Sequence, residues 1–262
     1  MQKHLLSNHQ LKVYASLKLK KYRQKYNKYL VEGEKIVEEL FQYNPHICES
    51  IIIKNSTDFV KPFAGFGGMV YTADQKSMER LSAHKTPPNI IAVVNLENSK
   101  SQSTNKLARQ SFYIYLYEMN DPGNLGTILR TAEWFGFDGV ILSQNCVDPL
   151  NPKVIQSSMG SIFRTPIFHI HSEELMSDYS DFNLIGSTAD PALSTAKIPD
   201  AQSNDGCILI IGSESHGIPL SLQSRISNWM HIPNYNKAKH PESLNAAISA
   251  AILCYSIRKE SI

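Results

Sequence analysis

The sequence predicts an α/β protein with two domains. Short apolar runs typical of buried strands alternate with helical patterns along most of the 262 residues, and 42% of the residues are hydrophobic, enough for a buried core. A polar segment rich in Ser and Asn, residues 97–106, interrupts this pattern. We therefore expect a first domain over residues 1–105, linker included, and a second over residues 106–262.

The first domain reads as a small α/β unit. A basic helix is expected up to about Tyr26, followed by an amphipathic helix over residues 34–43 and another helix over residues 74–81. Apolar, β-branched runs predict its strands, at residues 29–31, 51–53, 69–71 and 90–94.

The second domain has the rhythm of a mostly parallel sheet covered by helices on both faces. Strands are expected at residues 112–119, 139–142, 165–170, 184–185, 207–211 and 230–233. Helices are expected at residues 125–135, 154–159 and 173–179, after Pro219, and from Ser243 to the end. Ligands of such sheets bind beyond the carboxyl ends of the strands, so chemistry is to be sought in those loops.

Composition excludes several classes of protein. No run approaches the roughly 20 apolar residues of a membrane helix, and the N-terminus lacks the apolar core of a secretory signal, so a soluble, cytoplasmic protein is expected. The four cysteines form no CxxC pair, which argues against a zinc or redox motif and a disulfide framework. The pair His169 and His171 is a weak metal candidate, and we expect no metal.

Charge is distributed unevenly although the net charge is only +2. Residues 1–31 contain no Asp or Glu, while lysines and arginine alternate with tyrosines. Basic groups neutralise phosphates and tyrosine rings stack on bases, so an RNA-binding arm is one interpretation; a solvated helix surface is the other. The candidate RNA-binding residues of this arm are Lys18, Lys20, Lys21, Arg23, Lys25 and Lys28.

A first candidate loop, residues 120–127, joins a hydrophobic strand to a helix that carries Arg130. Asn124 or Thr127 can cap this helix, whose N-terminus offers unpaired N–H groups to an anion. Arg130 could reach the same anion. The alternative is an ordinary capped helix with a surface arginine.

The second and third loops also end strands. Residues 211–218 place Glu214 and His216 between two glycines, which allow a close backbone approach to a ligand. The third precedes a closing apolar helix, where Ser243 occupies the expected cap position. Buried packing explains that helix but leaves the polar Ser-x-Asn at its start unexplained.

Together, NDPGNLGTILRTAEWFGFDGVILS, LIIGSESHGI and HIPN…ESLNAAISAAI resemble the three motifs of the SpoU/TrmH family of SPOUT-class RNA ribose 2′-O-methyltransferases. KYRQKYNKYLVEGEKIVEEL and TPPNIIAVV are similar to the ribosomal-protein-like substrate-binding domain that precedes many of these enzymes. The resemblance implies a trefoil-knotted catalytic domain, a homodimer, and methyl transfer from S-adenosylmethionine to structured RNA, ribosomal in preference to transfer RNA. A non-catalytic RNA-binding protein on the same scaffold is the alternative.

The resemblance also implies site residues. The catalytic set would be Arg130, Asn120, Glu214, Ser243 and Asn245. In the family, Arg130 is the candidate for assisting loss of the proton from the ribose 2′-hydroxyl. Because a guanidinium is effectively always protonated, we expect Arg130 chiefly to clamp the neighbouring phosphate and stabilise developing negative charge. The cofactor would be held by Ser187, Thr188, Ile211, Gly212, Ser213, Glu214, Gly217, Ile232, Leu244 and Asn245. The chain departs from the family at Ser213, where Asn is usual, and in a longer, basic loop over residues 234–242.

Overall fold

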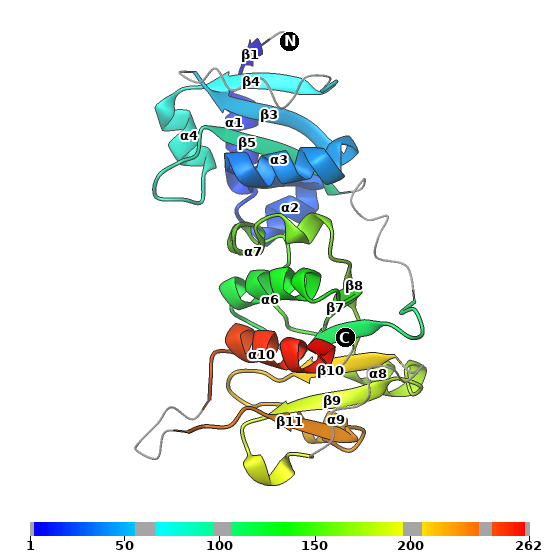
Figure 1. The fold of residues 1–262 in the computed structure, drawn as a ribbon. Coiled ribbons are helices and arrows are strands. Elements are labelled where there is room, and N and C mark those ends of the chain that lie inside the picture. The colour runs from blue at the N-terminus through cyan, green and yellow to red at the C-terminus, as the bar shows by residue number, and fades with distance from the viewer. Residues whose placement is uncertain (1–2, 56–65, 97–105, 196–205, 236–242, 260–262) are drawn as a thin grey trace. The chain divides into compact units, whose positions relative to one another are not determined.

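The computed structural model describes residues 3–55, 66–96, 106–195, 206–235 and 243–259 (Figure 1). The chain divides into two compact units. The first comprises residues 1–102 and 148–164, and the second comprises residues 103–147 and 165–262. The predicted linker, residues 97–106, lies almost entirely outside the described residues, so the boundary expected there stays a prediction.

The first unit contains a mixed five-stranded sheet in the order β1-β4-β3-β5-β2. Neighbours β1, β4 and β3 run parallel, whereas β5 is antiparallel to both β3 and β2. The strands are β1 Lys3–Leu5, β2 Lys28–Glu32, β3 Cys48–Lys54, β4 Met69–Ala73 and β5 Ile90–Asn95. All but β1 correspond to predicted strands.

Alternating side chains of these strands feed two separate cores, as the period of two requires. On β3, Ile51 and Ile53 belong to one hydrophobic cluster and Ile52 to the other. The helices that cover the two faces are α1 Asn8–Ser16, α2 Lys20–Tyr26, α3 Glu34–Tyr43 and α4 Gln75–Leu81, with a 3-10 turn η1 Pro45–Ile47. The single basic helix expected before Tyr26 is thus two helices, α1 and α2.

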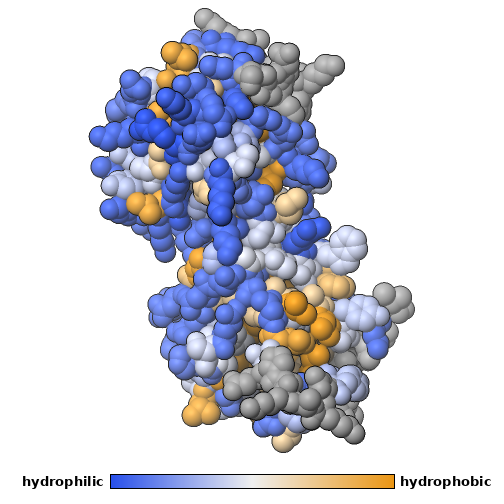
Figure 2. Space-filling view, turned by 90° about the vertical axis from the view of Figure 1, so that its left-hand side faces the viewer, coloured by the Kyte–Doolittle hydropathy of each residue, from blue (hydrophilic) through white to orange (hydrophobic). Residues whose placement is uncertain are grey.

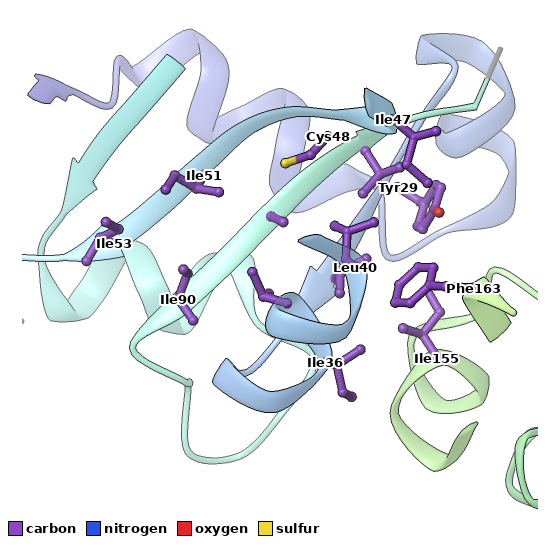
Figure 3. Packing of buried hydrophobic residues seen from close by; sticks show 14 of the residues in the cluster. Tyr29, Ile36, Leu40, Ile47, Cys48, Ile51, Ile53, Ile90, Ile155 and Phe163 are labelled. Atoms are coloured by element: carbon purple, nitrogen blue, oxygen red, sulfur yellow. The ribbon is translucent and has the colours of Figure 1, made fainter. Parts of the chain in front are cut away.

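Residues 148–164 were expected in the second domain, but they pack within the first unit. This segment forms α7 Pro152–Ser158 and the 3-10 turn η4 Ser161–Phe163. Its Ile155 and Phe163, which are 2% and 5% exposed, join the cluster that contains Ile36 and Leu40 of α3 (Figure 3). Burial of these side chains explains why the segment belongs to this core.

The second unit contains an all-parallel six-stranded sheet in the order β11-β9-β10-β6-β7-β8. Its strands are β6 Phe112–Leu116, β7 Gly139–Leu142, β8 Ile167–His169, β9 Asn183–Thr188, β10 Cys207–Ile211 and β11 Asn228–His231. Every residue of β7 and β10 is buried, as expected for central parallel strands. The prediction of a parallel α/β sheet is confirmed.

Helices of the second unit are α6 Pro122–Trp134, α8 Ser172–Asp178, α9 Leu220–Gln223 and α10 Ala246–Lys259, with a 3-10 turn η5 Pro191–Leu193. Helices α6 and α10 pack together (Figure 1). The Arg258 side chain of α10 donates hydrogen bonds to the carbonyl oxygens of Phe135 and Gly136, each 2.8 Å long, just beyond the end of α6. The guanidinium thereby satisfies carbonyl groups that the helix leaves unpaired.

Helix α10 has two apolar faces, and only one of them is buried. The buried face consists of Ala246, Ala247, Ala250, Leu253, Cys254 and Ile257, which are each at most 9% exposed. Ile248 and Tyr255 on the other face are 53% and 57% exposed. Helix α10 therefore packs internally through one apolar face and leaves a second apolar face at the surface.

Candidate functional site

The predicted loops meet at one edge of the second sheet. Strand β10 lies between β9 and β6, and β11 lies beyond β9. Register pairs the last residue of β10, Ile211, with the last of β6, Leu116, and the last of β11, His231, with Thr188 of β9. Since all these strands are parallel, the loops after Leu116, Thr188, Ile211 and His231 leave from the same edge.

The loop after β10 is a closed turn. Ser213 and Gly217 exchange two backbone hydrogen bonds of 3.0 Å, and Ser213 Oγ accepts the His216 N–H at 3.0 Å. A Cβ on Gly212 would lie 2.4 Å from the carbonyl carbon of Gly217, whose own φ is +66°. Both glycines are therefore required by geometry, and the serine that replaces the usual Asn holds the turn through its hydroxyl.

Asn124 joins the three loops and was not among the predicted site residues. Its Nδ2 donates to Glu214 Oε1 in the second loop, and its Oδ1 accepts from Asn245 Nδ2 at 3.0 Å. The sequence predicts Asn124 or Thr127 as the helix cap, but Asp121 caps α6 by accepting the Asn124 N–H at 2.8 Å. One feature of the sequence could have indicated this role: Asp121 is also a capping residue, so the loop does not need the amide of Asn124 as its helix cap.

At the third loop, Asn245 rather than the predicted Ser243 caps the closing helix. Asn245 Oδ1 accepts from the N–H groups of Ala247 and Ile248 at 3.0 and 3.3 Å. Both ends of its side-chain amide are thus engaged, one by the helix and one by Asn124. Ser243 is exposed and does not reach the helix start by a hydrogen bond, because α10 begins only at Ala246.

Arg130 and Asn120 make no hydrogen bond to this Asn124–Glu214–Asn245 cluster in the described structure. Both are exposed, and in the described part of the chain neither makes a hydrogen bond or ion pair. Arg130 lies six residues after Asn124 on α6, about 9 Å further along the helix axis. The structure brings Glu214 and Asn245 together through Asn124, and leaves Arg130 open to solvent.

The remaining predicted cofactor residues lie at the ends of β9 and β11 and just before α10. Ser187, Thr188 and Ile232 are half-buried at the ends of β9 and β11, where His231 Nδ1 lies 3.3 Å from the Thr188 carbonyl oxygen. Leu244 is 47% exposed just before α10.

The chemistry of these loops fits S-adenosylmethionine. Among the described residues 187–188, 211–217, 231–235 and 243–245, there is no lysine or arginine and one carboxylate, Glu214. A sulfonium cation is compatible with such a set, whereas a polyphosphate would meet no cation to balance its charge. Residues 236–242, with the basic part of the predicted long loop, lie outside the described residues.

The basic arm of the first unit presents lysines and stacked tyrosines. Tyr22 and Tyr26 stack with ring centroids 6.3 Å apart, and Lys21 Nζ lies 4.8 Å from the Tyr22 centroid. Lys25 Nζ lies 5.3 Å from the Tyr26 centroid. Lys20, Lys21 and Lys25 are exposed, Lys18 is half-buried, and Lys28 forms an ion pair with Glu49.

Arg23 does not belong to this surface, contrary to the prediction. Its side chain is 4% exposed and pairs with Asp148 at 2.5 Å. Its Nη1 donates to the carbonyl oxygens of Leu17 and Lys18, each at 2.9 Å, which bridges the turn between α1 and α2. Arg23 is a structural residue because its charge is already neutralised inside the first unit.

The described residues were also compared with the requirements of a metal site, a reactive thiolate and a membrane-spanning helix. No three His, Cys, Asp or Glu side chains there are grouped to hold a metal ion. Cys48 and Cys207 are buried, and burial raises the pKa of each thiol to about 12, which keeps them from reacting as thiolates. None of the described helices has both the length and the apolar character needed to cross a bilayer.

Comparison with protein families gives two matches that together cover both units. Residues 111–255 match the SpoU rRNA Methylase family, and residues 8–92 match the MRM3-like substrate binding domain. The first match spans more than half of the chain and contains the three loops and Asn124.

Individual relatives agree over nearly the whole length. The chain is 30% identical over 255 residues, 96% of each protein, to the 23S rRNA (guanosine(2553)-2′-O)-methyltransferase RlmP of Bacillus subtilis. A TrmH-family structure from Porphyromonas gingivalis is 28% identical, with a TM-score of 0.80 over 98% of this chain and 99% of that one. An rRNA methyltransferase from Sinorhizobium meliloti with bound AdoMet, 23% identical, has the same fold, with a TM-score of 0.82 over 100% and 98% of the two chains.

Proposed function

The chain belongs to the SpoU rRNA methylase family, and we propose that the loops around Asn124 form its site of methyl transfer. The protein is an S-adenosylmethionine-dependent ribose 2′-O-methyltransferase of ribosomal RNA. The observation that carries the site assignment is the hydrogen-bonded bridge from Asn124 to Glu214 and Asn245, which ties together the three motifs.

Within this site, the loop residues would bind the cofactor and the Asn124 bridge would hold their arrangement. The Ser213 backbone and the Ile211 carbonyl already make hydrogen bonds within the fold, so the backbone of Gly212, with the ends of β9 and β11, would offer neutral hydrogen-bonding groups to the nucleoside. When bound there, S-adenosylmethionine supplies an activated methyl group. Because both ends of the Asn245 amide are engaged, Asn245 would act by positioning Asn124 and the start of α10, rather than by binding the ribose.

Arg130 would serve the RNA. The ribose 2′-hydroxyl is a weak nucleophile that must be oriented and must lose its proton. A guanidinium keeps its own proton in proteins, so Arg130 is unsuited to act as the base. Its exposed, unpaired side chain would instead clamp the neighbouring phosphate and stabilise the negative charge that develops on the 2′-oxygen. Asn120 and Ser243, both exposed, would add hydrogen bonds to the ribose.

The first unit would hold the substrate RNA. Lys18, Lys20, Lys21 and Lys25 border the stacked rings of Tyr22 and Tyr26, a combination that suits phosphates and unpaired bases. The match to a substrate binding domain over residues 8–92 supports this division of labour.

We also propose that the protein acts as a homodimer. Figure 2 shows apolar side chains gathered on part of the second unit's surface. On α10 and the residues before it, Leu244, Ile248, Ile252 and Tyr255 are 38% to 57% exposed, an unusual density for a surface helix. A second copy of the chain would cover this face and bring its own surface near the site.

Two further features follow from family membership and are proposed with it. The C-terminal segment would thread through a loop to form a trefoil knot, which agrees with β10 lying between β9 and β6 and with Asn245 lying beside Asn124. Because its substrate is ribosomal RNA and its relative is bacterial, the protein would work in the cytoplasm.

Ribose-methylation mapping tests the function directly. Ribosomal RNA from cells with and without the gene should differ at one position, with 23S rRNA the first RNA to examine, since the Bacillus relative acts on it. The purified protein should restore that methyl group on RNA from the deletion strain when S-adenosylmethionine is added. Identical maps and no incorporation, with RNA binding retained, would instead identify a non-catalytic RNA-binding protein.

A further inference from the structure

Helix α6 presents only a narrow stripe of side chains to solvent. Of its 13 residues, Thr127, Arg130 and Trp134 are exposed, and the rest are buried or half-buried. The spacing of three and then four residues places these side chains on one face of the helix. The proposed function uses Arg130 but gives no role to Trp134, the largest side chain of the stripe.

Trp134 is unusually exposed for so large an apolar side chain. Its exposed fraction is 83%, higher than that of any other large hydrophobic residue on a described helix. Within the described residues, no aromatic ring or cation lies against the indole, and its N–H donates no hydrogen bond. A ligand that covered the ring would gain the stabilisation that comes from removing apolar surface from water.

Arg130 adds a planar cation next to this ring. Side chains four residues apart on a helix have Cβ atoms about 5–6 Å apart, so the guanidinium and the indole can reach the same ligand. Glu133, the carboxylate nearest to Arg130 in sequence, is half-buried and flanks the stripe. The local charge is therefore close to balanced, and the distinguishing feature is the open aromatic face beside an exposed guanidinium. This pair suits a ligand that combines a planar ring with a phosphate.

We propose that Trp134 stacks on the base of the RNA nucleotide next to the target ribose, while Arg130 holds the phosphate that joins the two nucleotides. The proposal rests on the proposed function, which brings the target ribose within reach of Arg130. Aromatic stacking combined with a phosphate contact is how proteins hold unpaired nucleotides, whereas a base inside a duplex has no free face to offer. Trp134 would thereby select a target that lies in an unpaired segment of the RNA.

A second copy of the chain is the other molecule that could cover Trp134. The surface assigned above to that copy is the exposed face of α10, which is apolar throughout. On α6, by contrast, the other members of the stripe are Thr127 and Arg130, one polar and one charged. A guanidinium at the centre of a protein interface must lose its water, whereas a phosphate of RNA balances its charge directly. These neighbours favour a nucleotide as the occupant.

Tryptophan fluorescence tests the contact directly, because the chain contains only two tryptophans. The other one, Trp229, is half-buried and packs against a core cluster that includes Ile226. Trp229→Phe leaves Trp134 as the only indole of the full-length chain. Titration of this variant with an unmethylated 23S rRNA transcript should quench the emission to a constant level, since a stacked base quenches indole. The same transcript annealed to its complement should leave the emission unchanged.

Substitutions separate stacking from charge. Trp134→Ala should lower affinity for the transcript about tenfold, as expected for one stacked base, without changing the slope of log affinity against log salt. Arg130→Ala should instead lower that slope by about 0.7, the value for one phosphate contact on a single strand. Trp134→Phe keeps an aromatic face and should recover most of the affinity. S-adenosylmethionine affinity and melting temperature should match wild type in all three variants, as for exposed residues.

Leu220→Ala is the matched control, because Leu220 is 81% exposed on α9 of the same unit. It should leave RNA affinity unchanged, and a loss equal to that of Trp134→Ala would overturn the proposal. Wild-type affinity in Trp134→Ala, or emission that the transcript does not quench, would also overturn it. Emission that shifts with protein concentration in the absence of RNA would assign Trp134 to a second copy instead.

The proposed function fails by a different result. If the transcript quenches Trp134 but the wild-type chain transfers no methyl group to it at saturating RNA and S-adenosylmethionine, the assigned site of methyl transfer is wrong while the stacking contact stands. If methyl transfer is normal and the emission is not quenched, the stacking contact is wrong while the site stands.

Discussion

Helices α2 and α6 each carry an arginine that the sequence marks as an RNA ligand, and the fold uses the two in opposite ways. Arg23 on α2 is buried and bound to Asp148 and to two carbonyl oxygens. Arg130 on α6 is exposed, and within the described residues it has no polar partner. One guanidinium stabilises the fold, and the other remains available for a substrate.

The distant partner of an arginine, rather than the local sequence pattern around it, decides what its charge does. Asp148 lies 125 residues from Arg23 in sequence, in a segment that interrupts the second unit and packs in the first. A pattern confined to residues 1–31 contains no carboxylate and therefore cannot reveal the pair. Arg130 forms no ion pair with a carboxylate in the described structure, so the prediction from sequence stays open to test.

The largest effect is expected on stability, from breaking the Arg23–Asp148 ion pair. Asp148→Ala would leave a buried, uncompensated guanidinium and should lower the free energy of unfolding by about 3–5 kcal/mol. Urea denaturation followed by circular dichroism measures this loss. The paired replacement Arg23→Met/Asp148→Leu should recover much of it, because no charge is then left buried. A loss below about 1 kcal/mol for Asp148→Ala would show that Arg23 is not a structural residue.

Arg130→Ala should have the opposite effect: it should slow methyl transfer and leave the stability of the fold unchanged. Single-turnover methyl transfer should slow by about 10²–10³-fold, the usual cost of losing one group that stabilises developing charge. Calorimetry should give nearly unchanged S-adenosylmethionine affinity, and the free energy of unfolding should stay within about 0.5 kcal/mol of wild type, as for an exposed residue without partners.

The control for this variant is Arg130→Lys, which keeps the charge but loses the planar fork, and should retain an intermediate rate. A single-turnover rate near wild type for Arg130→Ala would contradict the phosphate-clamp role.

A smaller effect is expected where the three loops join. Asn124→Ala removes the partner of both Glu214 and Asn245 and should cost about 1–3 kcal/mol, seen as weaker S-adenosylmethionine binding and a lower melting temperature. Thr127→Ala, one turn further along the same helix and exposed, serves as the matched control. Equal cofactor affinity in the two variants would remove Asn124 from the site.

The smallest effect per residue is expected on the basic arm. Lys20→Ala/Lys21→Ala/Lys25→Ala should reduce RNA affinity and lower the salt slope by about 2, without changing cofactor affinity. Lys28→Ala should reduce RNA affinity less than Lys20→Ala, Lys21→Ala or Lys25→Ala made singly, because Glu49 already neutralises Lys28. An unchanged slope in the triple variant would assign the arm to a solvated helix surface.

Because segment 148–164 packs in the first unit, the effects of an N-terminal truncation are harder to interpret. Deleting the N-terminal residues would leave Ile155 and Phe163 without the core that buries them. Such a truncation would remove RNA contacts and expose apolar surface at once. Point variants on α2 avoid this confusion.

Most strands and helices were predictable because each is a local pattern of burial. The alternation along β3 and the wholly apolar β10 follow from having two buried faces and from lying at the centre of a parallel sheet. Strand β1 was missed because its three residues are mostly exposed and pair only with β4. The break between α1 and α2 was missed because Arg23, which bridges it, looks like any other basic residue of the arm.

Local patterns in the sequence were enough for the α/β class, for every strand except β1 and for the three polar loops of the second unit, since periodicity and turn-forming residues are local properties. Only the tertiary structure decided that Asn124 links those loops, that Asn245 rather than Ser243 starts the last helix, and that Arg23 is buried. The reason is physical: a hydrogen bond or ion pair depends on which distant groups the packed core brings within about 3 Å, and no local pattern contains that distance.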